Sequence, residues 1–194
     1  MRSPARILND GGIAVIPTDT IYGVVAKARD RKAVTRLYAL RRKTPNKPFI
    51  ILISSVKDLA QFGIRPDRKT AEFLTSVWPG KVSVILPCLG KTFSYLHLGT
   101  ATLAFRLPKS KSLLALLKET GPLVAPSANR EGEKPAETIA EAKKYFGDEV
   151  DLYIGGNKKM RGKPSTLVSL VTGTPVVLRE GAVKITHPPA TRKE

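Results

Sequence analysis

The sequence predicts a single α/β domain built on a mixed β-sheet. Its 194 residues, of which 42% are hydrophobic, suffice for one core, because a typical domain has about 100 to 200 residues. Short apolar runs, most of them bounded by Pro or Gly, alternate with segments of helical periodicity, as in a layered α/β domain. Several neighbouring runs are joined too tightly for a helical crossover. We therefore expect antiparallel as well as parallel strand pairs.

Seven apolar runs are the predicted strands. Each has the length and most have the flanking turn residues of a buried strand. They comprise residues 13–16, 49–53, 82–86, 103–107, 123–125, 167–171 and 176–178.

Four segments have the apolar spacing of amphipathic helices. Helices are expected around residues 33–41, 71–78, 113–117 and 138–146. Pro79-Gly80, Gly121-Pro122 and Gly147 end the last three of them. We place the core at about residues 7–185 of a single domain, 1–194. The polar, Pro-rich tail 186–194 is expected to be disordered.

Charge and cysteine content indicate the kind of binding partner and the cellular compartment of the protein. Lys and Arg number 33 against 16 for Asp and Glu, which gives a formal net charge of +17 and indicates a polyanionic partner such as a nucleotide or RNA. A basic surface that only aids solubility is the alternative. The single cysteine, Cys88, fits a reducing compartment. The longest aliphatic run, 49–53, is far shorter than the roughly 20 residues of a membrane span, so we expect a cytoplasmic protein without a membrane segment.

A group of polar residues follows the first predicted strand. Residues 17–23 read Pro-Thr-Asp-Thr-Ile-Tyr-Gly and place two hydroxyls, a carboxylate and a phenol where the strand would end. Ligands of open α/β sheets bind just outside strand ends. We interpret these residues as one wall of a binding site. A simple turn leading into a second strand at 21–26 explains the same residues without a ligand.

A basic segment, 41–48, lies between a predicted helix and the strand 49–53. It contains Arg41, Arg42, Lys43 and Lys47. One or two cations at a helix C-terminus offset the negative end of the helix dipole, but four followed by a rigid turn exceed that need. Several converging cations are what a triphosphate requires.

Further polar residues follow the later strands. Ser127 and Asn129 come after the strand 123–125, where they could contact a ligand or cap the next segment. Ser165 precedes the strand 167–171, and Arg179 follows the strand 176–178. Arg106 lies within a strand, and an arginine there needs an anionic partner or an exposed face.

Several familiar kinds of site are excluded. Residues 156–165 depart from a P-loop in glycine spacing and in the strand that follows. His97 and His187 are the only histidines, which leaves little support for a Ser-His-Asp triad or a His-rich metal site. No carboxylate pair suits glycosidase chemistry. The residues alone therefore do not support any of these kinds of site.

Seven ordered segments resemble the motifs of the YrdC/TsaC family: PTDTIYG, RRKTPNKPF, VWPGKVSVIL, TLAFRLP, APSANREGEKPAET, KPSTLV and VLREGAV. The resemblance spans nearly the whole chain, and seven motifs in order are far more specific than any one of them. It implies the three-layer fold of that family, in which a twisted mixed sheet flanked by helices surrounds a basic concave cleft. It also implies the short, single-domain branch of the family.

The resemblance implies an enzyme, L-threonylcarbamoyladenylate synthase, a nucleotidyltransferase. Such enzymes combine L-threonine, bicarbonate and ATP into threonylcarbamoyl-AMP and pyrophosphate, and the threonylcarbamoyl group is later attached to tRNA. The implied chemistry needs no side-chain nucleophile, so no catalytic residue is predicted. Mg²⁺ is expected to arrive with ATP, held largely by phosphate oxygens, so no metal-ligating residue is predicted either. Implied partners are these substrates and the downstream proteins that transfer the group to tRNA, with direct contact to tRNA or other RNA possible through the basic surface.

Family positions matched in this sequence imply two sets of binding residues. For L-threonine they are Thr20, Tyr22, Arg106, Ala125 and Ser165, with Ala125 contributing main chain only. For ATP they are Arg41, Lys43, Lys47, Thr102, Ser127, Asn129 and Arg179.

One departure concerns the phosphate contacts. The usual Lys-x-Arg order of the family is inverted here to Arg41-Arg42-Lys43, and the two cations differ in reach and donor geometry. The main rival hypothesis is therefore a non-catalytic RNA-binding protein that uses the same basic cleft. Aromatic residues, on which single-stranded bases stack, make up only 6% of the chain, which disfavours this rival. An accessory domain of a larger carbamoyl-transferring enzyme is a second rival.

Overall fold

One β-sheet runs the length of the molecule. The computed structural model describes residues 3–41, 48–156 and 159–185. Its strands are β1 Ala14–Pro17, β2 Tyr22–Lys27, β3 Ile50–Leu52, β4 Val82–Pro87, β5 Thr102–Arg106, β6 Leu123–Val124, β7 Leu152–Tyr153, β8 Thr166–Ser169 and β9 Val176–Arg179. Among the described residues they form a nine-stranded sheet in the order β7-β1-β2-β6-β3-β5-β4-β8-β9.

The sheet is mixed, which confirms the sequence-based prediction. β1 and β2 form an antiparallel hairpin in which Ala14 lies opposite Val25. β4 and β5 are also antiparallel. The pairs β3–β5 and β4–β8 are parallel, with Leu52 beside Arg106 in the first of them. Each parallel pair is separated in sequence by a long connection that includes helical segments, as parallel pairing requires.

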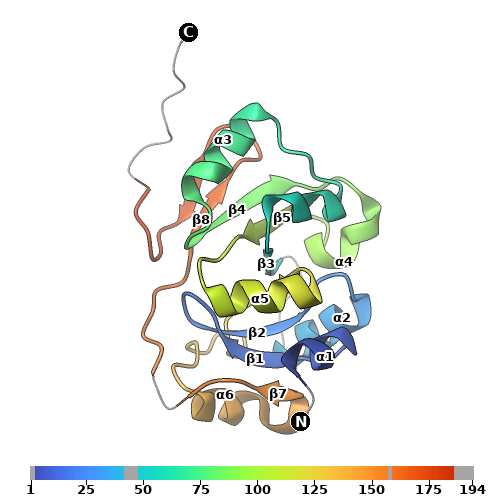
Figure 1. Ribbon diagram of the computed structural model, residues 1–194, viewed down its shortest axis with the longest axis vertical. Helices are drawn as coiled ribbons and strands as arrows, with labels where there is room; N and C mark the ends of the chain where they lie inside the picture. Colours follow the sequence, from blue (N-terminus) through green and yellow to red (C-terminus); the bar gives the residue numbers. More distant parts are fainter. Residues whose placement is uncertain (1–2, 42–47, 157–158, 186–194) are drawn as a thin grey trace.

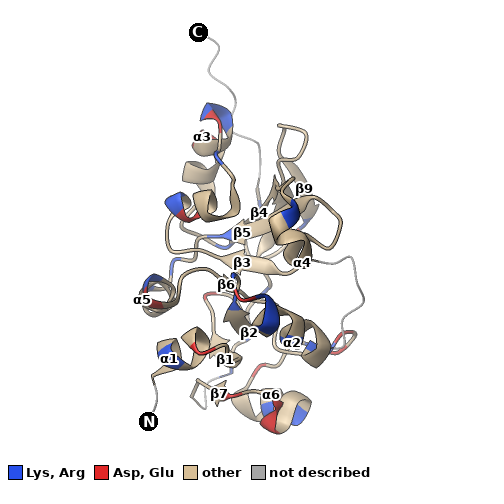
Figure 2. Ribbon diagram, turned by 90° about the vertical axis from the view of Figure 1, so that its right-hand side faces the viewer, with Lys and Arg blue, Asp and Glu red and all other residues tan. Residues whose placement is uncertain are grey.

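Helices cover both faces of the sheet. They are α1 Pro4–Asn9, α2 Arg31–Arg41, α3 Arg68–Val77, α4 Ser94–His97, α5 Lys111–Thr120 and α6 Ile139–Phe146. Short 3₁₀ segments occupy Val56–Phe62, Lys91–Phe93 and Gly147–Glu149. Figure 2 shows α1 and α5 on one side of the sheet and α2 and α4 on the other. The predicted α/β layering is therefore confirmed.

The hydrophobic core has two parts because both faces of the central strands are buried. In β1, Val15 packs into a core with Leu37 of α2, while its neighbour Ile16 packs into a second core with Leu113 and Leu117 of α5. Side chains alternate between the faces of a strand. A strand buried on both faces therefore reads as the continuous apolar run seen in the sequence.

Capping residues set the ends of the predicted helices. The Ser110 side chain accepts a hydrogen bond from the Leu113 amide and begins α5, and Gly121, with φ of 75°, follows its last residue. Thr138 caps α6 by accepting from the Glu141 amide. All four predicted helices are present, and α5 is longer than the predicted 113–117. The elements α1, α4 and β7 were not predicted, because they are too short to show a period in the sequence.

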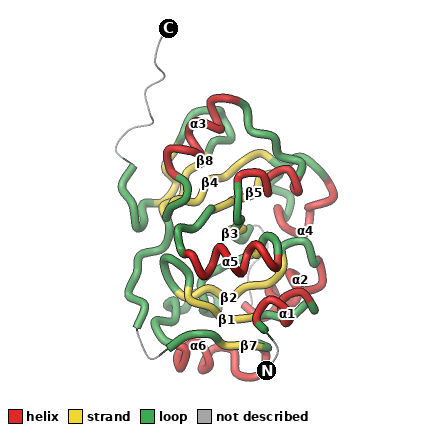
Figure 3. The backbone as a smooth tube through the Cα atoms, in the orientation of Figure 1, coloured by secondary structure: helices red, strands yellow, loops and turns green. Residues whose placement is uncertain are grey.

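An irregular segment joins the two ends of the sheet. We call its residues 159–165 the strap; the chain passes through it from β7 at one end of the molecule to β8 near the other (Figures 1 and 3). A Cβ added at Gly162 would overlap the carbonyl oxygen of Thr20, and one at Gly181 would overlap that of Pro164. The strap is thus packed between the β1–β2 loop and the segment that follows β9.

Two further sequence-based expectations concern membrane-spanning helices and the C-terminal tail. No helix in the described ranges is long and apolar enough to cross a membrane. The tail 186–194, expected to be disordered, lies outside the described residues.

Candidate ligand-binding site

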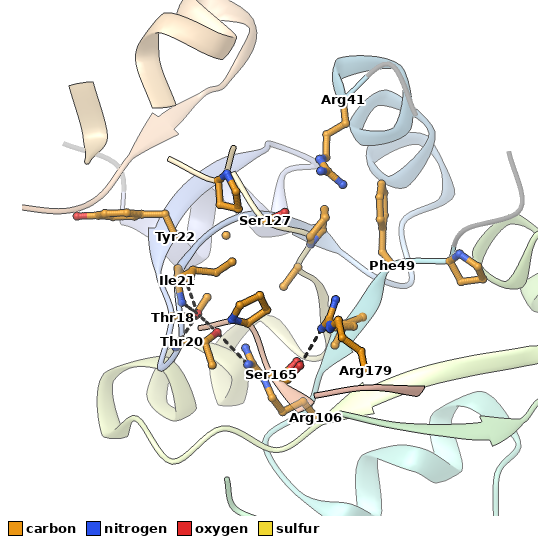
Figure 4. Close-up of a pocket in the computed structure, with 17 residues that line it drawn as sticks. Thr18, Thr20, Ile21, Tyr22, Arg41, Phe49, Arg106, Ser127, Ser165 and Arg179 are labelled. Carbon is orange, nitrogen blue, oxygen red and sulfur yellow. Dashed lines mark hydrogen bonds between the residues drawn. The ribbon is translucent and has the colours of Figure 1, made fainter. Parts of the chain in front are cut away.

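A pocket lies where the β1–β2 loop, the end of β5 and the strap converge (Figure 4). Its other walls come from the end of α2, the start of β3, the segment after β6 and the end of β9. Eight of the predicted site residues line it: Thr20, Tyr22, Arg41, Arg106, Ala125, Ser127, Ser165 and Arg179. Residues from segments far apart in the sequence are therefore brought together in one pocket.

The β1–β2 loop presents hydroxyl groups to this pocket. Thr18 and Thr20 both line it, and both are buried. The Thr18 hydroxyl donates to the carbonyl oxygen of Ile21 over 2.6 Å. The oxygen of the same hydroxyl accepts from the amides of Thr20 and Ile21 at 3.2 and 3.3 Å. These bonds close a tight turn, so the polar segment forms both a turn and a wall of the pocket.

Arg106 is the most deeply buried cation of the pocket, with 5% of its side chain exposed. Its Nη1 donates to the Thr20 hydroxyl over 3.0 Å, and its Nη2 lies 3.2 Å from Oδ1 of Asp19. Burial lowers the pKa of the guanidinium, the Asp19 carboxylate opposes this, and the nearby charge of Arg179 lowers the pKa further. The arginine within a strand thus has the anionic partner that the sequence analysis required.

Arg41 enters the pocket from the end of α2. Its Nε donates to the main-chain oxygen of Asn129 over 2.8 Å, and its guanidinium carbon lies 5.8 Å from the centre of the Phe49 ring. Burial is the main reason that its pKa is lowered. A buried cation in this position favours an anionic ligand, because a negative charge nearby stabilises the charged form.

Arg179 and Ser165 form the side of the pocket next to the strap. Nη2 of Arg179 donates to the main-chain oxygen of Ser165 over 2.8 Å, and burial lowers the pKa of Arg179. The Ser165 hydroxyl lies 2.8 Å from that of Ser83 on β4. In Figure 4, the labelled Arg106 and Arg179 side chains both lie beside Ser165. A ligand at this point would meet two guanidinium groups.

The segment after β6 supplies main-chain contacts. Ser127 forms an isolated antiparallel bridge with Gly23, and the Ala128 amide donates to the oxygen of Tyr22. Ala125 donates its amide to the oxygen of Ile50, and it lines the pocket. These bonds join the segment to β2 and β3, and they place Ser127 opposite Gly23 at the start of β2.

Four predicted residues are not among those that line the pocket. Asn129 lies just behind it and donates from Nδ2 to the main-chain oxygens of Arg130 and Glu133. Thr102 lies at the far end of β5 from Arg106, where its hydroxyl donates to that of Thr100. Lys43 and Lys47 fall outside the described residues.

Tyr22 lines the pocket, but Figure 4 shows its ring pointing away from the other labelled side chains. The residue is 2% exposed. A Cβ added at Gly155 would lie 2.7 Å from its hydroxyl oxygen, so the phenol packs against the segment after β7. The ring therefore packs in the core, and Tyr22 contributes mainly its backbone to the pocket wall.

Thr18 was expected in the wall formed by residues 17–23 but was not among the named binding residues, and the lining residues Phe49 and Pro164 had no predicted role at the site. The motif that contains Thr18 was recognised, but the direction of its hydroxyl depends on the turn geometry. Nothing in the sequence indicated a pocket role for Phe49, which is simply the first residue of an apolar run. Pro164 reaches the pocket only because the strap crosses the β1–β2 loop.

The charge of the pocket is unbalanced. Three guanidinium groups, those of Arg41, Arg106 and Arg179, line it. Asp19 lies beside Arg106 with 7% of its side chain exposed. Residues 3–41, 48–156 and 159–185 contain no group of three or more His, Cys, Asp or Glu side chains that could hold a metal ion. The fold and pocket together define an α/β protein with a pocket lined by three guanidinium groups, which favour an anionic ligand.

Comparison with known proteins places the chain in a family. The family model for Sua5, YciO and YrdC proteins, described as "Telomere recombination", matches residues 6–181. The chain therefore belongs to this family, as its motifs predicted. It is similar to a threonylcarbamoyl-AMP synthase of Bacillus subtilis, with 32% identity over 92% of the chain and 52% of that relative. The chain thus spans about half of that relative's length.

Two further comparisons agree. A putative threonylcarbamoyl-AMP synthase of Mycobacterium tuberculosis is 31% identical over 93% of this chain and 83% of its own length. The crystal structure of P. abyssi Sua5 complexed with L-threonine superposes with a TM-score of 0.83 at 28% identity, and the match covers 91% of this chain and 52% of that one. The similarity thus extends to the three-dimensional fold, which confirms the predicted fold of the family.

Proposed function

We propose that this chain is an L-threonylcarbamoyladenylate synthase, which makes threonylcarbamoyl-AMP and pyrophosphate from L-threonine, bicarbonate and ATP. Its family membership and the names of its relatives in B. subtilis and M. tuberculosis support the proposal. The observation that carries it is the meeting of Arg106 and Thr20 in a pocket that Arg41 and Arg179 also line.

Arg106 would bind the carboxylate of L-threonine. Nε of its guanidinium is buried and has no hydrogen-bond partner among the described residues, so a donor is available. Paired N–H donors of a guanidinium suit the two oxygens of a carboxylate. Thr20 and Ser165 would contact the rest of the amino acid, with the main chain of Ala125 beside them. The L-threonine complex of P. abyssi Sua5 supports an amino-acid site in this fold.

Arg41 and Arg179 would contact the phosphates of ATP, and Ser127 the nucleotide. Both guanidinium groups line the pocket, and burial lowers the pKa of each. An anionic ligand would offset the cost of burying the Arg41 charge, which is 7% exposed, whereas Arg179 is an exposed residue and would add a second cation at the rim. Lys43, Lys47, Thr102 and Asn129 remain predictions as ATP contacts.

The proposed reaction needs no side-chain nucleophile. The amine of L-threonine attacks carbon dioxide and releases a proton, or condenses with bicarbonate and releases water, and either route gives a carbamate. A carbamate oxygen then attacks the α-phosphorus of ATP, the bond to the β-phosphate oxygen breaks, and pyrophosphate leaves. The contribution of the protein would be to align the carbamate with the α-phosphate and to neutralise the charge of the phosphates through its guanidinium groups.

We also propose that Mg²⁺ accompanies ATP. The described residues offer no cluster of carboxylate, histidine or cysteine ligands, which fits an ion held by phosphate oxygens and water. The bound ion would neutralise charge on the leaving pyrophosphate. The product is an activated acyl donor, so a transferase that modifies tRNA adenosine in the cytoplasm would consume it.

Pyrophosphate release tests this proposal. The purified protein is incubated with ATP, Mg²⁺, L-threonine and bicarbonate, and each substrate is omitted in turn. We expect pyrophosphate only when all are present. Release that does not depend on L-threonine, or no release at all, would contradict the synthase function.

A further inference from the structure

We propose that Thr18 is a positioning residue for amino-acid binding, because it makes the Thr20 hydroxyl a hydrogen-bond acceptor toward the ligand. The inference rests on the proposed function, in which the ligand beside Thr20 is L-threonine. It concerns a residue to which the family motifs gave no role, and it follows from the donors and acceptors of the β1–β2 loop.

The proton of the Thr18 hydroxyl is committed to one partner. A hydroxyl has a single hydrogen to donate. The Thr18 oxygen lies 2.6 Å from the carbonyl oxygen of Ile21, which can only accept, and 3.1 Å from the Thr20 hydroxyl oxygen. The Thr18 proton therefore lies in the shorter of these two contacts, the one with the Ile21 carbonyl oxygen. In the contact between the two threonines, Thr20 is therefore the donor and Thr18 the acceptor.

Two amides also donate to the Thr18 oxygen. The main-chain nitrogens of Thr20 and Ile21 both point to the Thr18 oxygen, at 3.2 and 3.3 Å. Amide nitrogens only donate. The two lone pairs of the Thr18 oxygen are thus shared by three donors, the two amides and the Thr20 hydroxyl, while its one proton goes to the Ile21 carbonyl.

Arg106 completes the chain of hydrogen bonds. Its Nη1 lies 3.0 Å from the Thr20 hydroxyl oxygen and can only donate. Figure 4 shows these bonds as dashed lines running from Arg106 through Thr20 to the β1–β2 loop. The Thr20 oxygen therefore gives its proton to Thr18 and accepts one from Arg106, which leaves one lone pair for the ligand.

Because the Thr20 hydroxyl acts as an acceptor, it determines which group of the ligand binds next to it. An acceptor attracts the ammonium or hydroxyl group of L-threonine, whereas the carboxylate is attracted to the Arg106 guanidinium. Both threonines line the pocket and are at most 9% exposed, so water competes little for the remaining lone pair. Thr18 thus acts on the ligand through Thr20.

Calorimetry with L-threonine alone, and KM values for L-threonine and ATP, test the inference in four variants. Thr18→Val keeps the shape but removes the hydroxyl, Thr18→Ser keeps the hydroxyl, and Thr20→Val and the double variant Thr18→Val/Thr20→Val complete a cycle. Thr120→Val is the matched control, because Thr120 is a buried threonine outside the pocket whose hydroxyl also donates to carbonyls.

We expect Thr18→Val to weaken L-threonine binding about tenfold with the KM for ATP nearly unchanged, and Thr18→Ser and the control to bind like the wild type. The double variant should bind no worse than Thr20→Val alone. The inference is overturned if Thr18→Val binds normally, if Thr18→Ser fails equally, if the two losses add, or if the wild type binds no L-threonine. A wild type that binds L-threonine but releases no pyrophosphate contradicts the synthase function alone.

Discussion

Asp19 and Arg106 form a buried ion pair at the base of the pocket, with 3.2 Å between Oδ1 and Nη2 and side chains 7% and 5% exposed. Neither carboxylate oxygen of Asp19 has a hydrogen-bond partner among the described residues. The pair is therefore held by charge, and it joins the β1–β2 loop to the end of β5. The ion pair and the proposed contact with L-threonine therefore use the same guanidinium.

Removing the carboxylate should destabilise the protein. We expect Asp19→Ala to lower the free energy of unfolding in urea by about 3 kcal/mol, because Arg106 is left buried without its partner. Glu72→Ala is the control, since it breaks an exposed ion pair with Arg68 and should cost less than about 1 kcal/mol. Equal decreases in the free energy of unfolding in the two variants would show that the buried Asp19–Arg106 pair stabilises the protein no more than an exposed pair does.

Removing the guanidinium should affect one substrate more than the other. We expect Arg106→Ala to raise the KM for L-threonine at least about tenfold, because a charge-assisted hydrogen bond to the carboxylate is lost. The KM for ATP should change much less. Steady-state kinetics with each substrate varied in turn measures both values. Equal increases would argue against the assignment of Arg106 to the amino acid.

The close packing of the strap on the β1–β2 loop gives a third prediction. Gly162→Ala would push a methyl group against the Thr20 carbonyl and displace the strap that carries Ser165. We expect kcat/KM to fall between about 10- and 100-fold, because small displacements in a site are costly. Gly156→Ala is the matched control on the same connection, where an added Cβ has no neighbour within 4 Å. Normal activity of Gly162→Ala would refute the close contact.

Tyr38 gives a prediction for alkaline pH. Its ring stacks on Phe49 of the pocket at 4.0 Å, and burial raises its pKa from 10.0 to about 12. The folded protein then holds this proton more tightly than the unfolded chain does. The stabilising contribution is complete below pH 10.0 and is lost as the pH rises through about 12.

Tyr38→Phe should therefore reduce the loss of stability across this range. Urea unfolding at pH of about 9 and about 11.5 measures the difference between variant and wild type. The other tyrosines titrate in both proteins and cancel in the comparison. A variant that loses as much stability as the wild type would show that Tyr38 is not the group responsible.

Much of the site follows from the sequence because burial leaves a simple pattern. A strand covered on both faces reads as an apolar run, so the ends of β1 and β5 could be located and the polar residues beside them recognised. Arg106 stood out because a charged residue inside such a run needs a partner. The meeting of Thr20 with Arg106, 86 residues apart, was implied by the family motifs.

Other features depend on geometry that the motifs do not contain. Thr102 shares a strand with Arg106, but four residues of extended chain separate them by about 13 Å, so only Arg106 reaches the pocket. The ring of Tyr22 packs into the core although its backbone forms the wall. The polarity of the Thr18 hydroxyl arises from a turn whose hydrogen bonds involve main-chain atoms.

The most direct test of the proposed function is the fate of carbon from bicarbonate. The protein is incubated with carbon-13 bicarbonate, L-threonine, ATP and Mg²⁺, and the products are analysed by mass spectrometry. We expect an adenylate that contains threonine and one labelled carbon, formed together with pyrophosphate. An unlabelled threonyl adenylate, or AMP and pyrophosphate without any threonine-containing product, would contradict the carbamoylation step and with it the assignment as a synthase.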